Sequence, residues 1–339
     1  MHYQDKIYGG VKIDEPIILE LMKCKSMQRL KGIDQHGHYE NFFPHSNISR
    51  FEHSVGVFIL LREFGASILE QVSGLLHDVS HTVFSHVADY IFHDGSGRYQ
   101  NFQDDELEGF IERSEIPGIL RKHGINYEDI LDDSKFLLKE RELPDLCADR
   151  IDYFLRDALA FKKATKKEIK ELFSNLFVEK KEWVFVNKDS AKKYANLFLE
   201  VNNACWSGLE SGVMLKSMGE LLKYCINKKI VTRDDLFTTD KEVWIKIRPG
   251  VKKDPRLRIL VDRADNKYKY KISDKKDFDL LSLNKSRAVD PLFYENGKLI
   301  RLSTVDKEFK KLQEKYSKHK KYYIKFLEER SAESPKGLK

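Results

Sequence analysis

The spacing of apolar residues predicts that most of the first 225 residues are helical. Apolar residues recur every three or four positions from Pro16 to Ile33, and the same spacing returns from Val55 to Leu76. Such spacing is typical of a helix with one buried face. Further helical patterns cover Val83–Phe92, Asp105–Glu112, Leu143–Phe161 and Lys167–Phe177.

Short patterns of another kind lie between and after these helices. Two apolar runs flank a charged turn over residues 177–186, which predicts a small β-hairpin on the helical body. Apolar and polar residues then alternate in 244–248, 268–272 and 299–302. Alternation with a period of two indicates strands with one buried face.

These patterns predict a mostly α fold in two parts. We expect a helical domain over 1–230 and a C-terminal extension over 231–339. Within the extension, an α+β region occupies about 235–305, and a basic helix runs from about Lys307 to Glu329.

Composition narrows the class of protein. The chain has 339 residues, of which 41% are hydrophobic and 34% are charged. The longest apolar run, Val55–Leu61, has seven residues, whereas a membrane span needs about 20. The N-terminus also lacks a basic start followed by an apolar block, so we expect a cytoplasmic protein. Four cysteines lack CxxC spacing, so we expect reduced thiols. They are Cys24, Cys147, Cys205 and Cys225.

Positive charge is concentrated at the C-terminal end. The net charge is +6, and residues 301–339 alone hold 12 Lys and Arg against 6 Asp and Glu. A basic surface of this kind is able to bind nucleic acid. Because acidic residues are interleaved, we favour an ordinary solvated helix.

The histidines carry the strongest chemical signal. His77, His81 and His86 fall within ten residues, and His53 precedes them. On a helix, His77 and His81 share one face. Buried imidazole rings need partners, and imidazoles with carboxylates suit a divalent Mn, Fe, Zn, Co or Ni ion.

His53, His77 and Asp78 offer three ligands for such an ion, and a later helix is able to supply a fourth. Asp149, Tyr153 and Asp157 share one helical face of that segment. The alternative is that its charged residues form surface ion pairs. These residues are Arg150, Asp152, Arg156 and Asp157.

The sequence motifs around these residues resemble those of the HD-domain metal-dependent phosphohydrolases. They are MQRLKGIDQ at 27–35, RFEHSVGV at 50–57, LLHDVSHTVFSH at 75–86 and DRIDYFLRD at 149–157. The branch with these motifs contains the deoxynucleoside triphosphate (dNTP) triphosphohydrolases. The resemblance covers residues 7–160, fades through 225 and does not extend over the C-terminal third.

The resemblance implies roles for individual residues. The metal ligands would be His53, His77, Asp78 and Asp149. The catalytic histidines would be His81 and His86, near the attacking water and the leaving oxygen. The substrate contacts would be Gln35, Arg50, Arg150, Tyr153 and Asp157, with Mg²⁺ as a further ion on the substrate phosphates.

Three positions depart from the family pattern. His36 stands where relatives place an apolar residue against the sugar. Gln103 is the nearest residue to an expected phosphate-contacting histidine. Glu210 lies in the segment where relatives carry a lysine, so we expect weaker binding of a triphosphate.

We therefore expect an HD-family enzyme that hydrolyses a (deoxy)nucleoside triphosphate to nucleoside and triphosphate, and that forms homo-oligomers as its relatives do. One alternative is a nucleotidase or phosphodiesterase acting on another phosphoester. Another is a regulator of low turnover that binds nucleotides or nucleic acid. The sequence shows no Gly-rich phosphate loop, HEXXH or GXSXG motif.

Overall fold

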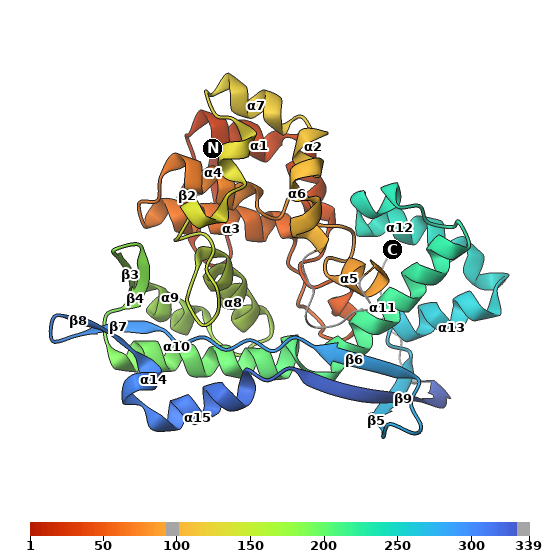
Figure 1. Ribbon diagram of the computed structural model, residues 1–339. Coiled ribbons are helices and arrows are strands. Elements are labelled where there is room, and N and C mark those ends of the chain that lie inside the picture. Colours follow the sequence, from red (N-terminus) through yellow and green to blue (C-terminus); the bar gives the residue numbers. More distant parts are fainter. Residues whose placement is uncertain (93–101, 331–339) are drawn as a thin grey trace.

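A computed structural model describes residues 1–92 and 102–330, and their fold is mostly α, as the sequence predicts (Figure 1). The helices in this part of the chain are α1 (Pro16–Lys23), α2 (Lys25–Arg29), α3 (Arg50–Glu63), α4 (Ile68–Leu76), α5 (Val87–Phe92), α6 (Phe102–Glu112), α7 (Ile116–Lys122), α8 (Ala148–Ala160), α9 (Lys166–Ser174), α10 (Lys188–Val201), α11 (Leu209–Asn227), α12 (Asp240–Ile247), α13 (Pro255–Ala264), α14 (Leu302–Val305) and α15 (Lys307–Tyr316).

Nine strands in the same residues form three small sheets. The strands are β1 (His2–Asp5), β2 (Gly9–Lys12), β3 (Leu176–Glu179), β4 (Glu182–Phe185), β5 (Tyr268–Ile272), β6 (Leu280–Asn284), β7 (Leu292–Glu295), β8 (Lys298–Arg301) and β9 (Lys320–Arg330). Their orders are β1-β2, β3-β4-β7-β8 and β5-β9-β6. The predicted hairpin at 177–186 is confirmed, and its strand β4 also pairs in parallel with β7.

Local capping explains where the helices near the histidines begin. The side chain of Ser49 accepts a hydrogen bond from the backbone of Glu52, and the Glu52 carboxylate accepts one in return, which starts α3 at Arg50. The predicted helix from Val55 to Leu76 is two helices, because Gly65 has a φ of +75° and Ser67 caps α4.

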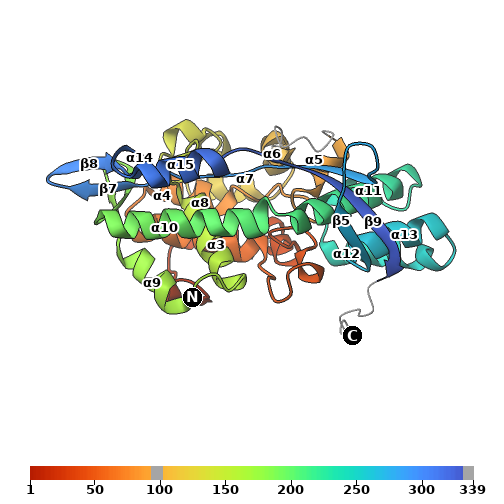
Figure 2. The ribbon, with the colours of Figure 1, turned by 90° about the horizontal axis from the view of Figure 1, so that it is seen from below.

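Two predictions for the C-terminal part are wrong. The alternating residues 244–247 lie in the helix α12, which starts at a capping box formed by Thr239 and Glu242. Five residues with this pattern fit a helix as well as a strand. The predicted terminal helix ends at Tyr316, and 320–330 form the central strand β9 of a sheet (Figure 2). Aromatic and β-branched residues, as in Tyr322–Ile324, favour a strand.

Three hydrophobic clusters make up the core of the described residues. The second cluster contains Val213 and Met218 from one side of residue 230, and Val243 and Ile324 from the other. The boundary at residue 230 stays a prediction. All four cysteines are buried and free, as expected. Within residues 1–92 and 102–330, no helix combines the length and the apolar composition that a membrane crossing requires.

The structure predicts that α15 is a structural helix. Phe309 is 1% exposed and belongs to the first core cluster, whereas Leu312 on the same helix is 40% exposed. We expect Phe309→Ala to lower the free energy of unfolding by about 3–5 kcal/mol. Leu312→Ala, as the control, should change it by about 0.5 kcal/mol or less. Urea titration measures both, and equal small losses would contradict a structural role for α15.

Candidate active site

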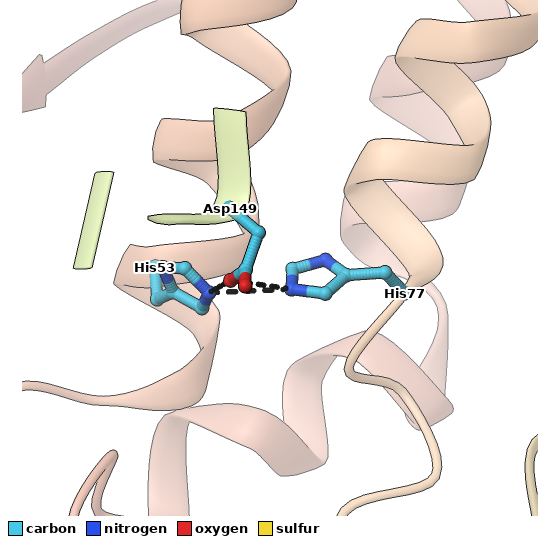
Figure 3. Close-up of side chains that lie close together, drawn as sticks. All are labelled: His53, His77 and Asp149. Atoms are coloured by element: carbon cyan, nitrogen blue, oxygen red, sulfur yellow. Dashed lines mark hydrogen bonds and ion pairs between the residues drawn. The ribbon is translucent and has the colours of Figure 1, made fainter. Parts of the chain in front are cut away.

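Four of the predicted site residues meet where three helices converge. His53 lies in the first turns of α3, His77 and Asp78 directly follow the end of α4, and Asp149 lies in the first turn of α8. The capping of α3 and α4 sets these positions. Figure 3 shows the carboxylate of Asp149 between the rings of His53 and His77.

The distances among these side chains fit the ligands of one ion. Nε2 of His53 lies 3.2 Å from Nε2 of His77 and 2.9 Å from Oδ1 of Asp149. Nε2 of His77 lies 3.4 Å from Oδ1 of Asp149 and 3.5 Å from Oδ1 of Asp78. Atoms bound to a single ion at about 2.1 Å are separated by about 3.0–3.5 Å.

Hydrogen bonds on the other side of each ring decide which nitrogen is available. Nδ1 of His77 donates to the carbonyl of Gly74 at 2.7 Å, and Nδ1 of His53 faces Oδ2 of Asp152 at 2.8 Å. Since both partners are acceptors, each Nδ1 carries the hydrogen and each Nε2 of a neutral ring offers a lone pair. Two Nε2 atoms and two carboxylates therefore converge, an arrangement that suits a cation at the centre.

The pKa values of His53 and Asp78 are shifted in the directions that favour a protonated imidazole and an ionised carboxylate. Burial alone lowers the pKa of His53, but hydrogen bonds to Asp149 and Asp152 raise it to about 9 overall. Burial alone raises the pKa of Asp78, but the positive charges of Arg50 and His77 lower it well below its usual range. A metal ion at this place competes with protons for the same atoms.

A buried ionic network contacts His53 through its Nδ1 atom. Asp152, 0% exposed, accepts hydrogen bonds from Nε of Arg156 at 2.7 Å and from the hydroxyl of Tyr8 at 2.9 Å. Arg156 also pairs with Asp5 of β1 at 2.8 Å. The alternative that the charges of α8 form only surface ion pairs is therefore wrong for Asp152 and Arg156.

A second trio of potential ligands lies beside the first. Carboxylate or thiol atoms of Glu140, Cys147 and Asp149 are within 4.8 Å of one another. Burial raises the pKa of the Cys147 thiol well above its usual value. Since metals bind the thiolate form, this trio is the weaker candidate.

His81 lies beside Asp78, and its ring is in edge-on contact with the ring of His86, with a centroid distance of 5.3 Å. Nε2 of His81 is 3.1 Å from Oδ1 of Asp78, and burial together with the charge of Arg50 lowers the pKa of His81 to about 3. His81 is thus neutral near pH 7. His77 and His81 do not share a regular helix, because α4 ends at Leu76 and a turn follows.

Arg50 links the cluster to the rest of the site. Its guanidinium donates to Oδ2 of Asp78 at 2.6 Å, to Oγ of Ser85 at 2.9 Å and to the carbonyl of Gln35 at 2.8 Å. Its Nη2 lies 3.5 Å from Nε2 of His86. The buried guanidinium of Arg50 therefore contacts Asp78 of the His53–His77–Asp78–Asp149 cluster and lies beside His86.

The cluster opens into a cavity of about 850 Å³. All of the predicted site residues line it except His53 and Asp157, which lie behind its wall. Gln35 is notable because its Oε1 is buried and accepts no hydrogen bond from the described residues. The lining includes Gln35, Arg50, His77, Asp78, His81, His86, Asp149, Arg150 and Tyr153.

Two of the predicted substrate contacts are already engaged by the protein. Arg150 donates to the carbonyls of Arg141 and Asp145 at 3.2 and 2.6 Å. Asp157 accepts from Nε1 of Trp206 at 2.6 Å, and its other oxygen lies 2.7 Å from Nε2 of His36. Asp157 is also 0% exposed and does not line the cavity, so the structure offers a sugar no direct contact with it.

The three departures from the family pattern occupy different environments. His36 lines the cavity, and its ring stacks on Tyr39 with a centroid distance of 4.8 Å. Gln103 lines the cavity as well. Glu210, in the first turn of α11, is not among the described lining residues. The expectation that Glu210 repels a triphosphate is therefore not supported.

Sequence reasoning missed several residues of the site. Asp89, 1% exposed, lies 3.6 Å from Nδ1 of His86, and Asp152 orients His53. Lys285 and Arg287 bring positive charge from the C-terminal part into the wall of the cavity. Asp152 and Asp89 each lie three residues after a site residue, which was a usable signal, whereas nothing local in the sequence marks Lys285.

Comparison with known proteins agrees with this geometry. Residues 50–158 match the HD domain. The uncharacterized protein YdhJ of Bacillus subtilis is 33% identical over 332 residues, which cover 97% of this chain and 100% of YdhJ. The metal-dependent phosphohydrolase cns2 of Cordyceps militaris is 30% identical over 302 residues, which cover 87% of this chain and 85% of cns2.

A more distant similarity covers a smaller share of the chain. The deoxynucleoside triphosphate triphosphohydrolase SAMHD1 of Danio rerio is 31% identical over 105 residues, which cover 26% of this chain and 17% of SAMHD1. The near full-length match to cns2 and the HD-domain match together decide the family. This chain belongs to the HD-domain family of metal-dependent phosphohydrolases.

Proposed function

We propose that this protein hydrolyses a nucleotide, most simply a (deoxy)nucleoside triphosphate that is split into nucleoside and triphosphate. His53, His77, Asp78 and Asp149 are the proposed ligands of a Mn, Fe, Zn, Co or Ni ion. The observation that carries the proposal is the convergence of two Nε2 lone pairs and two carboxylates beside a cavity that also holds Arg50.

Different groups at the site would stabilise charge and transfer protons. An ion bound there supplies Lewis-acid catalysis and neutralises phosphoryl charge. Arg50 stabilises further negative charge as it develops on the phosphoryl oxygens. His81 is neutral near pH 7, so it is able to accept a proton from a reacting water or oxygen. His86, beside Asp89, is the second histidine able to move a proton.

Other residues of the cavity lining suit a nucleoside. Oε1 of Gln35 is a buried acceptor without a partner among the described residues, which fits a sugar hydroxyl as donor. The rings of His36, Tyr39, Tyr153 and Trp206 line the same cavity, and aromatic faces bind nucleobases by stacking. A cavity of about 850 Å³ lies within the usual range for small-molecule sites.

Product analysis across a panel of nucleotides tests this proposal. Purified protein with Mn²⁺, Fe²⁺, Co²⁺, Ni²⁺ or Zn²⁺ is incubated with nucleoside mono-, di- and triphosphates and their deoxy forms. Release of tripolyphosphate from a triphosphate is the expected result. If no nucleotide is hydrolysed with any of these metals, the proposed function is wrong.

A second candidate is a nucleotidase or phosphodiesterase acting on a shorter phosphoester. It is favoured by the engagement of Arg150 with backbone carbonyls and by the neutral side chain of Gln103. Both leave fewer contacts for a chain of three phosphates. Release of orthophosphate from monophosphates, without turnover of triphosphates, would select this candidate.

Replacement of His81 separates catalysis from metal binding. His81→Ala should keep the metal and the fold but reduce kcat by roughly 100-fold or more, the usual contribution of a positioned acid or base. His81 is 2% exposed, so His81→Gln, which fills more of the space, checks that loss of activity does not come from a packing defect. Unchanged kcat in both variants would exclude His81 from the reaction.

A further inference from the structure

The C-terminal part of the chain builds one wall of the cavity. Asn284 is the last residue of β6, and Lys285 and Arg287 lie in the segment that runs along α10 from β6 to β7 (Figures 1 and 2). All three residues line the cavity beside the metal cluster. The catalytic cavity therefore depends on residues far outside the HD domain match at 50–158.

Hydrogen bonds hold this segment rigidly on the helical body. Asn284 donates to the carbonyl of Gly208 at 2.6 Å, and Ser286 accepts from Nδ2 of Asn202 at 2.9 Å. The backbone N–H of Arg287 donates to Oδ1 of Asn202 at 2.9 Å. Asn202, Asn284 and Ser286 are at most 3% exposed. Because both neighbours of Lys285 are anchored, its backbone position is well defined.

Lys285 differs from the arginines of the described lining. The guanidinium groups of Arg50, Arg141 and Arg150 donate to backbone carbonyls or carboxylates at distances given by the fold. Arg287 also has an interaction partner. Among the described residues, no carboxylate lies within ion-pair distance of Lys285. Within the part of the chain that the structure describes, Lys285 is therefore a cavity cation available to a ligand.

The surroundings of Lys285 favour an anionic ligand. Burial, and next the like charge of Arg287, lower the pKa of Lys285, and the negative charges of Asp104 and Asp89 act against this from beyond ion-pair distance. A partly buried ammonium group without a counter-charge is costly. An anion bound there would remove that cost. Asp104, whose charge acts on Lys285, directly follows the neutral Gln103 in the sequence.

We propose that Lys285 binds a phosphoryl group of the substrate and thereby adds the C-terminal part to the substrate site. This inference rests on the proposed function, because it concerns the same cavity. It assigns to the C-terminal part a role in substrate affinity, in addition to the contacts proposed for the HD domain and the metal ion. Hydrogen bonds between charged groups are stronger than neutral ones, so the contact should contribute about tenfold or more to affinity.

Anion binding and kinetics of Lys285 variants test this proposal. Calorimetry with inorganic tripolyphosphate, and with orthophosphate, measures affinity for the metal-loaded protein without any turnover. Lys285→Ala should weaken the binding of the tighter of these two anions by about tenfold or more and raise KM by a similar factor, with kcat much less affected. Lys285→Arg, which keeps the charge, should restore most of the affinity.

The control is Lys298→Ala, which removes an exposed lysine from β8 in the same part of the chain. It should leave anion affinity unchanged, and metal content and thermal melting should match the wild type in all variants. If Lys285→Ala binds both anions as tightly as Lys298→Ala does, the inference is wrong. Absence of turnover in the wild type would overturn the proposed function, while the anion titrations would still decide the role of Lys285.

Discussion

Replacement of His77 by alanine should remove the transition metal from the purified protein while the helical fold persists. Nε2 of His77 lies 3.2 Å from Nε2 of His53 and 3.4 Å from Oδ1 of Asp149, and its Nδ1 is held by the carbonyl of Gly74. Loss of this ring leaves an incomplete ligand set. We expect metal content near zero by elemental analysis, and hydrolysis reduced by at least about 1,000-fold, because metal and catalysis are lost together.

The matched control for this experiment is His2→Ala, which removes an exposed histidine from β1. It should keep both metal and activity. Circular dichroism of His77→Ala should match the wild type, since His77 follows the end of α4 and lies outside the helix. Full metal occupancy in His77→Ala would show that the ion is bound elsewhere.

Replacement of Asp152 should produce the largest loss of stability in the site. Asp152 is 0% exposed, and its carboxylate is hydrogen-bonded to Arg156, Tyr8 and His53. In Asp152→Ala, these buried polar groups lose their common partner. Breaking a buried ion pair costs about 3–5 kcal/mol, and loss of the residue that orients a ligand weakens metal binding by about 10- to 100-fold.

Urea unfolding of the metal-free protein and metal titration of the native protein measure these two effects separately. Asp152→Asn retains a hydrogen-bond acceptor for His53 and should fall between the wild type and Asp152→Ala. Glu20→Ala removes surface ion pairs with Lys122 and His123 and should cost about 1 kcal/mol or less. If Asp152→Ala costs no more than Glu20→Ala, the network around Arg156 does not stabilise the fold.

The convergence of His53, His77, Asp78 and Asp149 was predictable because each residue stands in a recognisable local sequence. A histidine in a capped helix, a His-Asp pair after a second helix and an aspartate at the start of a third each carry a recognisable neighbourhood. The hairpin at 177–186 was predictable for the same reason, since both strands and their turn are consecutive.

Features that depend on distant parts of the chain were not predictable. Residues 320–330 read as a continuation of a basic helix, and only pairing with β5 and β6 makes them a strand. Lys285 reaches the cavity because Asn202, more than 80 positions earlier, anchors its neighbours. The role of Asp152 depends on Asp5 and Tyr8 at the N-terminus. Long-range contacts of this kind leave no periodic signal in the sequence.

Removal and restoration of the metal tests the central claim most directly. The wild-type protein is treated with a chelator, analysed for metal, and assayed on the nucleotide panel before and after addition of Mn²⁺, Fe²⁺, Co²⁺, Ni²⁺ or Zn²⁺. The structure predicts that chelation abolishes nucleotide hydrolysis and that at least one of these ions restores it, with about one tightly bound ion per chain. Hydrolysis that persists in metal-free protein, or its absence with every ion, would contradict metal-dependent nucleotide hydrolysis at the His53–His77–Asp78–Asp149 cluster.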